Sequence, residues 1–270
     1  MDYFPDSEPK REALYHAALI DAKKLRIGYV NADKRTQQLL LEHGTFERIF
    51  AQENVPVKDG LVRIIEGSPD FSVMRISDDS YPEALKEEGR TPVLYYRGNQ
   101  ELLDNKSMAV VGTRRTQFID YNHAQHVLER LLKKEYTIVS GLASGSDTIG
   151  HTYAVEHGGN TIAILGTPLN RSYPRENQDL QEKIAQEHLL VSQYPVGAAT
   201  SPSHFKHRNI TTVSLASDGL LVVHSPDGSG TLHAIREAHA QRKEIYALAN
   251  NFNKGYNWVK KISPKRVGRK

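Results

Sequence analysis

The sequence of 270 residues contains no cysteine. Disulfide bridges, zinc sites with thiolate ligands and thiol nucleophiles are therefore excluded. The sequence has no run of 18 or more apolar residues, so a membrane-spanning helix is not expected. The first 16 residues, MDYFPDSEPKREALYH, are too acidic and polar for a signal peptide, and we expect a cytoplasmic protein.

Several signatures of enzymes and cofactor sites are also missing. VVGTRRT at 110–116 has one glycine where dinucleotide-binding loops have G-x-G-x-x-G, and no acidic partner for a ribose is suitably placed. SGLASGSD at 140–147 lacks both the GK[ST] of a P-loop and the G-x-S-x-G of a nucleophile elbow. We find no carboxylate pair, catalytic triad order or metal-ligand constellation. The sequence favours a binding protein over an enzyme, with no catalytic residue, metal or cofactor expected.

Charge is unevenly distributed, although the net charge is only +3. From residue 253 onward there is no acid, and the basic residues are Lys254, Lys260, Lys261, Lys265, Arg266, Arg269 and Lys270. Such a segment can follow an anionic partner, and it can equally be a solvated, disordered end. Both interpretations stay open from the sequence.

The first part of the chain is expected to be helical. Apolar residues recur at helical spacing through 11–53. A mixed stretch rich in proline and glycine follows at 55–69 and is expected to be a linker. The predicted organisation is a small helical domain with its linker over 1–68, a second domain over 69–258 and a basic tail over 259–270.

From residue 91 onward, short apolar runs alternate with amphipathic stretches. The predicted strands are TPVLYYRG (91–98), MAVVG (108–112), YTIVSG (136–141), TIAILG (161–166), LLVSQY (189–194), GLLVVH (219–224) and EIYALA (244–249). The predicted helices span 119–134, 147–157, 175–188, 208–216 and 229–241. This alternation is typical of βαβ units around a parallel sheet, and it predicts an α/β fold. Ligands of open α/β sheets bind at the carboxyl ends of the strands, which places a site in the loops at 112–116, 140–147, 166–175, 194–208 and 224–231.

SGLASGSDTIGH at 140–151 is predicted to be an anion-binding turn. Backbone N–H groups in a glycine-rich strand–helix turn can approach a phosphate, and the helix dipole favours negative charge there. The glycines are Gly141 and Gly145, and the hydroxyls of Ser140, Ser144 and Ser146 can add donors. Asp147 is expected to cap the helix N-terminus. A plain tight turn is the alternative.

Two other strand ends carry residues suited to anions. After the strand at 108–112, guanidinium groups offer planar, bidentate phosphate contacts; the residues are Gly112, Thr113, Arg114 and Arg115. PDGSGT at 226–231 precedes a helical pattern, so we expect a second anion site at that helix start. Its donors are Ser229, Gly230 and Thr231.

HFKHRN at 204–209 combines basic, polar and aromatic side chains. His204 and His207 have the spacing of a metal pair, but no nearby carboxylate or cysteine completes such a site. The composition fits a nucleic-acid strand better, with charge for phosphates and a ring for a base. The candidate residues are His204, Phe205, Lys206, Arg208 and Asn209. Core packing is the alternative for Phe205.

Taken in order, these stretches resemble the DprA/Smf family of DNA-processing proteins. The resemblance covers roughly 75–258 and is carried by the combination, since no one motif is specific. The stretches are YPEALKEEGRTPVLYYRGNQELL (81–103), MAVVGTRRT (108–116), SGLASGSDTIGH (140–151), LGTPLNRSYPRENQDL (165–180), HFKHRNITTVSLASDGLLVV (204–223) and SGTLHAIREAHAQRKEIYALA (229–249).

The resemblance implies an extended Rossmann-like domain, with a mostly parallel sheet flanked by helices, that binds single-stranded DNA as a homodimer. It implies no nicotinamide cofactor and no membrane contact. Members deliver a RecA-type recombinase to DNA that enters by natural transformation, displacing single-strand-binding protein. The implied DNA-binding pocket uses Arg114 after Gly112, the loop 140–145, the segment 204–209 and the turn 229–231.

The sequence also departs from the family pattern. Residues 11–53 are similar to the family's small N-terminal helical domain, but one glycine, Gly28, stands where hairpin glycines are expected. The family's arginine-rich RNR after the phenylalanine is reduced to Arg208-Asn209-Ile210. KGYNWVKK (254–261) resembles the start of the closing segment, and we do not expect the winged-helix domain that many members carry.

Two other functions stay open from the sequence. PDGSGTLHA at 226–234 resembles the PGGxGTxxE motif of LOG-type phosphoribohydrolases, but Ala234 stands where those enzymes need glutamate. A helical turn rises about 5 Å, so Glu237 is expected to lie too far along the helix to replace it. A sensor that binds one small nucleotide in the same pocket is the second alternative. Affinity that grows with oligomer length would separate a strand binder from both.

Overall fold

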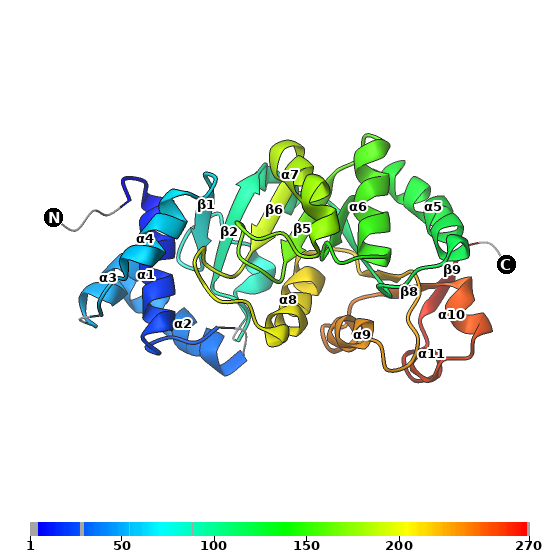
Figure 1. Cartoon of the computed structure of the whole chain (residues 1–270). Coiled ribbons are helices and arrows are strands. Elements are labelled where there is room, and N and C mark those ends of the chain that lie inside the picture. Colours follow the sequence, from blue (N-terminus) through cyan, green and yellow to red (C-terminus); the bar gives the residue numbers. More distant parts are fainter. Residues whose placement is uncertain (1–4, 28–29, 54, 88, 269–270) are drawn as a thin grey trace. The chain divides into compact units, whose positions relative to one another are not determined.

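The computed structural model describes residues 5–27, 30–53, 55–87 and 89–268. The chain divides into two compact units. The colours in Figure 1 follow the sequence from blue at the N-terminus to red at the C-terminus. Unit 1 comprises residues 1–97, 165–171 and 191–208; unit 2 comprises 98–164, 172–190 and 209–270. No helix in the described ranges is long and apolar enough to cross a membrane.

Unit 1 begins with helices, as the sequence predicts. They are α1 (Glu8–Asp21), α2 (Val30–His43), α3 (Phe46–Ala51) and α4 (Asp59–Glu66), followed by the antiparallel strands β1 (Ser72–Arg75) and β2 (Val93–Gly98). The α3 N-terminus is capped from α1, because the buried Glu12 carboxylate accepts the N–H groups of Phe46 and Glu47 at 3.0 and 3.1 Å. Helix α4 lies within the expected linker and fully buries Ile65, so this part of the segment is not an irregular connection.

Most of the parallel sheet lies in unit 2. The strands are β3 (Ser107–Val111), β4 (Thr137–Ser140), β5 (Thr161–Leu165), β6 (Leu189–Ser192), β7 (Leu220–Val222), β8 (Ile245–Leu248) and β9 (Lys265–Val267). The helices are α5 (Phe118–Leu132), α6 (Ser146–Glu156), α7 (Gln178–Glu187), α8 (Pro202–Leu215), α9 (Thr231–Ala240), α10 (Ala249–Asn253) and α11 (Asn257–Ile262). Short 3-10 helices cover Glu83–Leu85, Gln100–Asp104 and Arg175–Asn177. The ends of β5 and β6 and the first half of α8 are assigned to unit 1.

The strand order is β1-β2-β6-β5-β4-β3-β7-β8-β9. Every pairing from β5 through β9 in that order is parallel. The predicted α/β fold, with a mostly parallel sheet and N-terminal helices, is therefore confirmed. From β3 the chain runs outward through β4 and β5, then returns to place β7 on the other side of β3. The carboxyl ends of β3 and β7 thus flank the topological switch point, where open α/β sheets bind their ligands.

Apolar side chains from both layers fill the core of unit 2. Helices α5 and α6 pack against each other beside β3 and β4 (Figure 1). Ala124 and Leu128 of α5 meet Val110 and Ile138 of the strands, and all four are completely buried. This explains why the strands read as continuous apolar runs, since a parallel sheet is covered on its faces.

The structure corrects one expected helix boundary and one of the two interpretations of the tail. Helix α8 begins at Pro202, so HFKHRN is helical and does not belong to a loop. The basic tail is ordered over much of its length, because it contains α11 and β9. Strand β9 pairs in parallel with β8, and Lys265 forms an ion pair with Glu244 at 2.7 Å. The interpretation as a disordered end therefore does not hold for these elements.

Candidate nucleic-acid interface

Three loops of unit 2 meet at the carboxyl edge of the sheet, and Thr113 lies at their centre. Its backbone N–H donates to the His224 carbonyl at 2.7 Å, which ties the loop after β3 to the loop after β7. Its own carbonyl accepts from the backbone N–H and the hydroxyl of Ser146 at 3.1 and 3.2 Å, which ties the same loop to the start of α6. The predicted segments 112–115, 140–145 and 229–231 all belong to these joined loops.

Two glycines permit this close packing. A side chain on Gly112 would bring its Cβ within 2.2 Å of the Ser146 hydroxyl and 2.9 Å of the His224 carbonyl. A Cβ on Gly145 would lie 2.4 Å from the Thr113 carbonyl oxygen, and Gly145 also has a φ of +80°. Both glycines are therefore required by neighbouring protein atoms, whatever the loops bind.

The donors of the β4 turn are largely used within the fold. Ser140 is completely buried and donates its hydroxyl to the Val110 carbonyl. The Ser144 hydroxyl donates to Glu176 at 2.7 Å, which places a carboxylate beside this turn. Gly141 is buried as well. Such packing is expected of a plain tight turn, the alternative given above. It leaves few hydroxyl donors in this turn for a phosphate.

The expected role of Asp147 is wrong. The N-cap position of α6 is occupied by Gly145, and Asp147 is the second residue of the helix. The Asp147 carboxylate instead accepts the N–H of Ala143 at 3.3 Å. It therefore holds the shape of the preceding turn.

The arginines after β3 are exposed. Arg114 and Arg115 follow the buried Val111, and the Arg115 N–H donates to the Thr113 hydroxyl oxygen at 3.2 Å. This short-range bond sets the backbone of the turn while leaving the Arg115 side chain on the surface. Two apolar side chains come next, because Phe118 is 80% exposed and Ile119 is 47% exposed at the start of α5. Positive charge and an exposed ring thus occur together.

The β7 turn differs from the β4 turn because it is open. In the described chain, nothing lies within 4 Å of a Cβ built on Gly228 or Gly230. The turn is fastened from its other side: the Ser225 and Ser229 hydroxyls lie 2.9 Å apart, and Asp227 accepts the backbone N–H of Asn257 at 2.9 Å. Thr231 begins α9 and is 8% exposed. The turn is therefore held in place with its glycines facing space.

A polar network that sequence reasoning missed supports the switch point. His224 Nδ1 lies 3.1 Å from the buried Asp120 carboxylate, and its Nε2 lies 2.9 Å from the Tyr256 hydroxyl. Asn250 donates to the other Asp120 oxygen at 2.6 Å. Burial raises the pKa of Tyr256. These residues come from four separate segments, so no local spacing could have revealed them.

The α8 segment belongs largely to unit 1, where His204 is packed and neutral. The Tyr194 ring stacks on the His204 ring with centroids 4.1 Å apart, and the Tyr194 hydroxyl donates to the His204 carbonyl at 2.9 Å. Burial lowers the pKa of His204 to about 4. His204 is therefore uncharged at neutral pH and adds no cation for a phosphate.

His207 is also buried. The Gln193 amide donates to His207 Nδ1 at 2.7 Å, and His207 Nε2 lies 3.2 Å from an Asp33 carboxylate oxygen. Burial, with His204 nearby, lowers the pKa of His207 to about 4, and burial raises the pKa of Asp33. The two histidines thus join α8 to its surroundings in unit 1.

The other α8 candidates differ in exposure. Lys206 is exposed, Phe205 and Asn209 are half-buried, and Arg208 is 4% exposed. The Phe205 ring lies close to Gly166, because a Cβ there would meet the ring at 2.5 Å. Asn209 is assigned to unit 2 and the others to unit 1. Lys206 is thus the most accessible of the predicted α8 residues.

Comparisons with known proteins agree with this architecture. A family model described as DNA recombination-mediator protein A matches residues 72–261. The chain is 34% identical over 209 residues to the DNA processing protein DprA of Streptococcus pneumoniae, covering 77% of this chain and 72% of that protein. It is 33% identical over 215 residues to the Synechocystis protein Smf, and it spans 53% of that protein's length.

Two solved structures resemble this one closely. The X-ray structure of DNA processing protein A from Streptococcus pneumoniae has a TM-score of 0.70 and 31% sequence identity, covering 83% of this chain and 78% of that chain. The protein of the same name from Helicobacter pylori has a TM-score of 0.63 and 26% identity, covering 73% and 91%. That second structure is described as giving insights into a unique single-stranded DNA binding mode.

Proposed function

The chain belongs to the DNA recombination-mediator protein A family, and on that premise we propose that it binds single-stranded DNA along the carboxyl edge of unit 2. The observation that carries the proposal is the joining of the β3 and β7 loops at the switch point, with Arg114 and Arg115 exposed beside it. The single-stranded DNA binding described for the Helicobacter relative supports the choice of ligand.

In this proposal, some exposed groups contact phosphates and one contacts a base. The guanidinium groups of Arg114 and Arg115 contact phosphates, since they can donate two parallel hydrogen bonds to one group. The open backbone of the β7 turn at 228–230 receives another phosphate. Phe118 stacks on a base, a contact that contributes on the order of 1–3 kcal/mol and tolerates any sequence. Within unit 1, the exposed Lys206 is proposed to contact a phosphate in its own right. Affinity therefore falls steeply with salt.

Strand binding is the basis of a wider role that we propose for this protein. We propose that the protein acts in the cytoplasm as a homodimer, protects incoming single strands and delivers a RecA-type recombinase to them during transformation or homologous recombination. Family membership supports these steps. In a reconstituted test, the protein should speed recombinase assembly on strands coated with single-strand-binding protein. If assembly is no faster with the protein than without it, the delivery role is wrong.

The binding proposal is tested by fluorescence anisotropy with labelled oligo-dT of increasing length. We expect affinity to rise with length until the interface is filled, and matched duplexes to bind much more weakly. Unlabelled mononucleotides should fail to compete, because one nucleotide meets one part of the interface. Saturation by a mononucleotide, with no gain from length, would contradict strand binding and favour the nucleotide sensor or the LOG-like hydrolase.

A further inference from the structure

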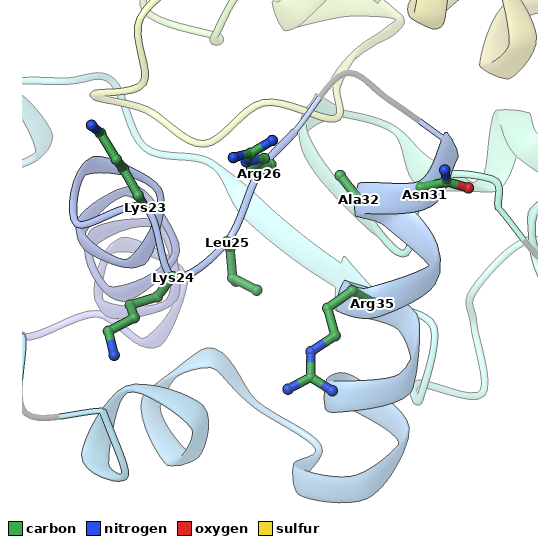
Figure 2. Close-up of a pocket in the computed structure, with 7 residues that line it drawn as sticks. All are labelled: Lys23, Lys24, Leu25, Arg26, Asn31, Ala32 and Arg35. Carbon is green, nitrogen blue, oxygen red and sulfur yellow. The ribbon is translucent and has the colours of Figure 1, made fainter.

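Unit 1 contains a pocket whose charged lining is entirely basic. Its volume is about 490 Å³, and it lies between the end of α1 and the first turns of α2 (Figure 2). The lining residues are Lys23, Lys24, Leu25, Arg26, Asn31, Ala32 and Arg35. Four of these seven side chains are cations, and no acid is among them. This pocket belongs to the helices of unit 1 and to none of the loops described above.

The backbone at the end of α1 places two of the lysines. The N–H of Lys23 donates to the Ile20 carbonyl and that of Lys24 to the Leu19 carbonyl, both at 2.9 Å. These are the paired bonds of a Schellman motif, in which the residue after the cap is usually glycine. Here that residue is Lys23, with a φ of +60°. A lysine therefore occupies a position where glycine is conformationally easier, and its side chain lines the pocket.

Little of the pocket's charge is neutralised by the protein. Lys24 forms an ion pair with Glu53 at 2.8 Å. The nearby Asp21 is paired with Lys58, and Asp33 is buried beside His207. No ion pair or side-chain hydrogen bond joins Lys23, Arg26 or Arg35 to the rest of the described residues. Cations that line one pocket repel one another, and anions bound among them would relieve that repulsion.

We propose that this pocket binds consecutive backbone phosphates of a nucleic-acid strand. The cations do not converge on one point: Figure 2 shows Lys24 and Arg35 extending toward one side, and Lys23 and Arg26 lying toward the other. Such a spread suits several phosphates in succession. The lining has no aromatic ring on which a base could stack, and Leu25 is 3% exposed. Most of the polar lining is cationic and suits phosphates. The contact is therefore independent of sequence and sensitive to salt.

This second site belongs to unit 1 and rests on the proposed function in one respect, that a nucleic-acid strand is the ligand. It predicts that unit 1 makes phosphate contacts of its own. Each single-strand phosphate that is neutralised adds about 0.7 to the slope of log affinity against log salt. Removing three cations should therefore make the slope less steep by up to about 2.

The test compares two triple variants of the full chain with the same change in charge. The first, Lys23→Gln, Arg26→Gln and Arg35→Gln, removes the unpaired cations of the pocket. The control, Lys58→Gln, Arg63→Gln and Lys86→Gln, removes three cations of unit 1 outside it. Salt slopes are measured with a long oligo-dT and a matched duplex, and inorganic triphosphate is titrated separately by calorimetry. Circular dichroism and thermal melting confirm that both variants fold.

We expect the pocket variant to have a less steep salt slope and a several-fold lower affinity for a single strand. The control variant should bind like the natural chain. Equal slopes for the pocket variant and the natural chain, or an equal loss in the control, would overturn the site. A third outcome is that the natural chain binds triphosphate saturably, the pocket variant does not, and the strand slopes are unchanged. That outcome would overturn the strand site and indicate that the pocket binds a free polyphosphate.

The Arg114→Ala variant, measured alongside, separates the pocket proposal from the edge proposal. If only Arg114→Ala makes the slope less steep, the edge site is supported and the pocket site is wrong. If only the pocket variant does so, the pocket site is supported and the edge site is wrong.

Discussion

Two glycine-rich turns at the same sheet edge look alike in sequence and differ in structure. After β4, Gly145 is pressed against the Thr113 carbonyl, and the serines of that turn donate to protein acceptors. After β7, Gly228 and Gly230 meet no described atom within 4 Å of a built Cβ. The first turn builds the site by fixing the β3 loop, and the second is open to a ligand. A glycine-rich motif therefore does not by itself identify the surface that binds.

The largest effect should follow from Gly145→Ala. The added methyl group would lie 2.4 Å from a backbone oxygen, at a φ of +80° that side chains rarely adopt. We expect about 3 kcal/mol or more of lost stability, measured by chemical unfolding. Gly158→Ala is the matched control, because φ is +67° there and the described chain leaves the space open. It should cost about 1–2 kcal/mol. Equal losses would show that close packing at Gly145 contributes nothing.

A smaller effect should follow from loosening the support of the open turn. Asp227→Ala removes the carboxylate that accepts backbone N–H groups of Asn257 and Trp258 at the start of α11. Losing such a cap typically costs about 1 kcal/mol. Strand affinity should fall as well, because the turn is less well ordered. Asp227→Asn keeps one acceptor oxygen and should recover most of both losses; an asparagine variant as weak as the alanine variant would argue against the cap.

The smallest effect on stability should come from Gly230→Ala. Gly230 has a φ of −61° and open space at its Cβ position, so the free energy of unfolding should change by about 0.5 kcal/mol or less. If a phosphate approaches this backbone, the methyl group should still weaken oligo-dT binding several-fold in an anisotropy titration. Unchanged affinity would remove the β7 turn from the interface.

Much of the fold could be predicted because buried strands and amphipathic helices leave periodic apolar patterns. Helix α4 and strand β9 were missed because both are short, and the exposed basic residues of β9 gave no apolar signal. The start of α8 was missed because its buried positions include polar His204 and His207. The two histidines are buried against Tyr194, Gln193 and Asp33. These residues are 10 or more positions away along the chain, and no sequence pattern links them to α8.

The sequence indicates which loops share the sheet edge more fully than it indicates what each residue in them does. Sequence located Gly145 and Gly230 but could not say whether each glycine makes room for protein or for a ligand, because that depends on tertiary neighbours. The network of Asp120, His224 and Tyr256 was invisible for the same reason, since its members are brought together by strand order.

The most direct test of strand binding at this edge is the salt dependence of oligo-dT affinity for the natural chain, Arg114→Ala and Arg130→Ala. Arg114 follows β3 at the carboxyl edge, whereas Arg130 is another exposed arginine near the C-terminal end of α5. We predict that Arg114→Ala weakens binding and makes the slope less steep by about 0.7 to 1, with Arg130→Ala unchanged. An unchanged slope and affinity in Arg114→Ala would contradict a phosphate contact at the switch point.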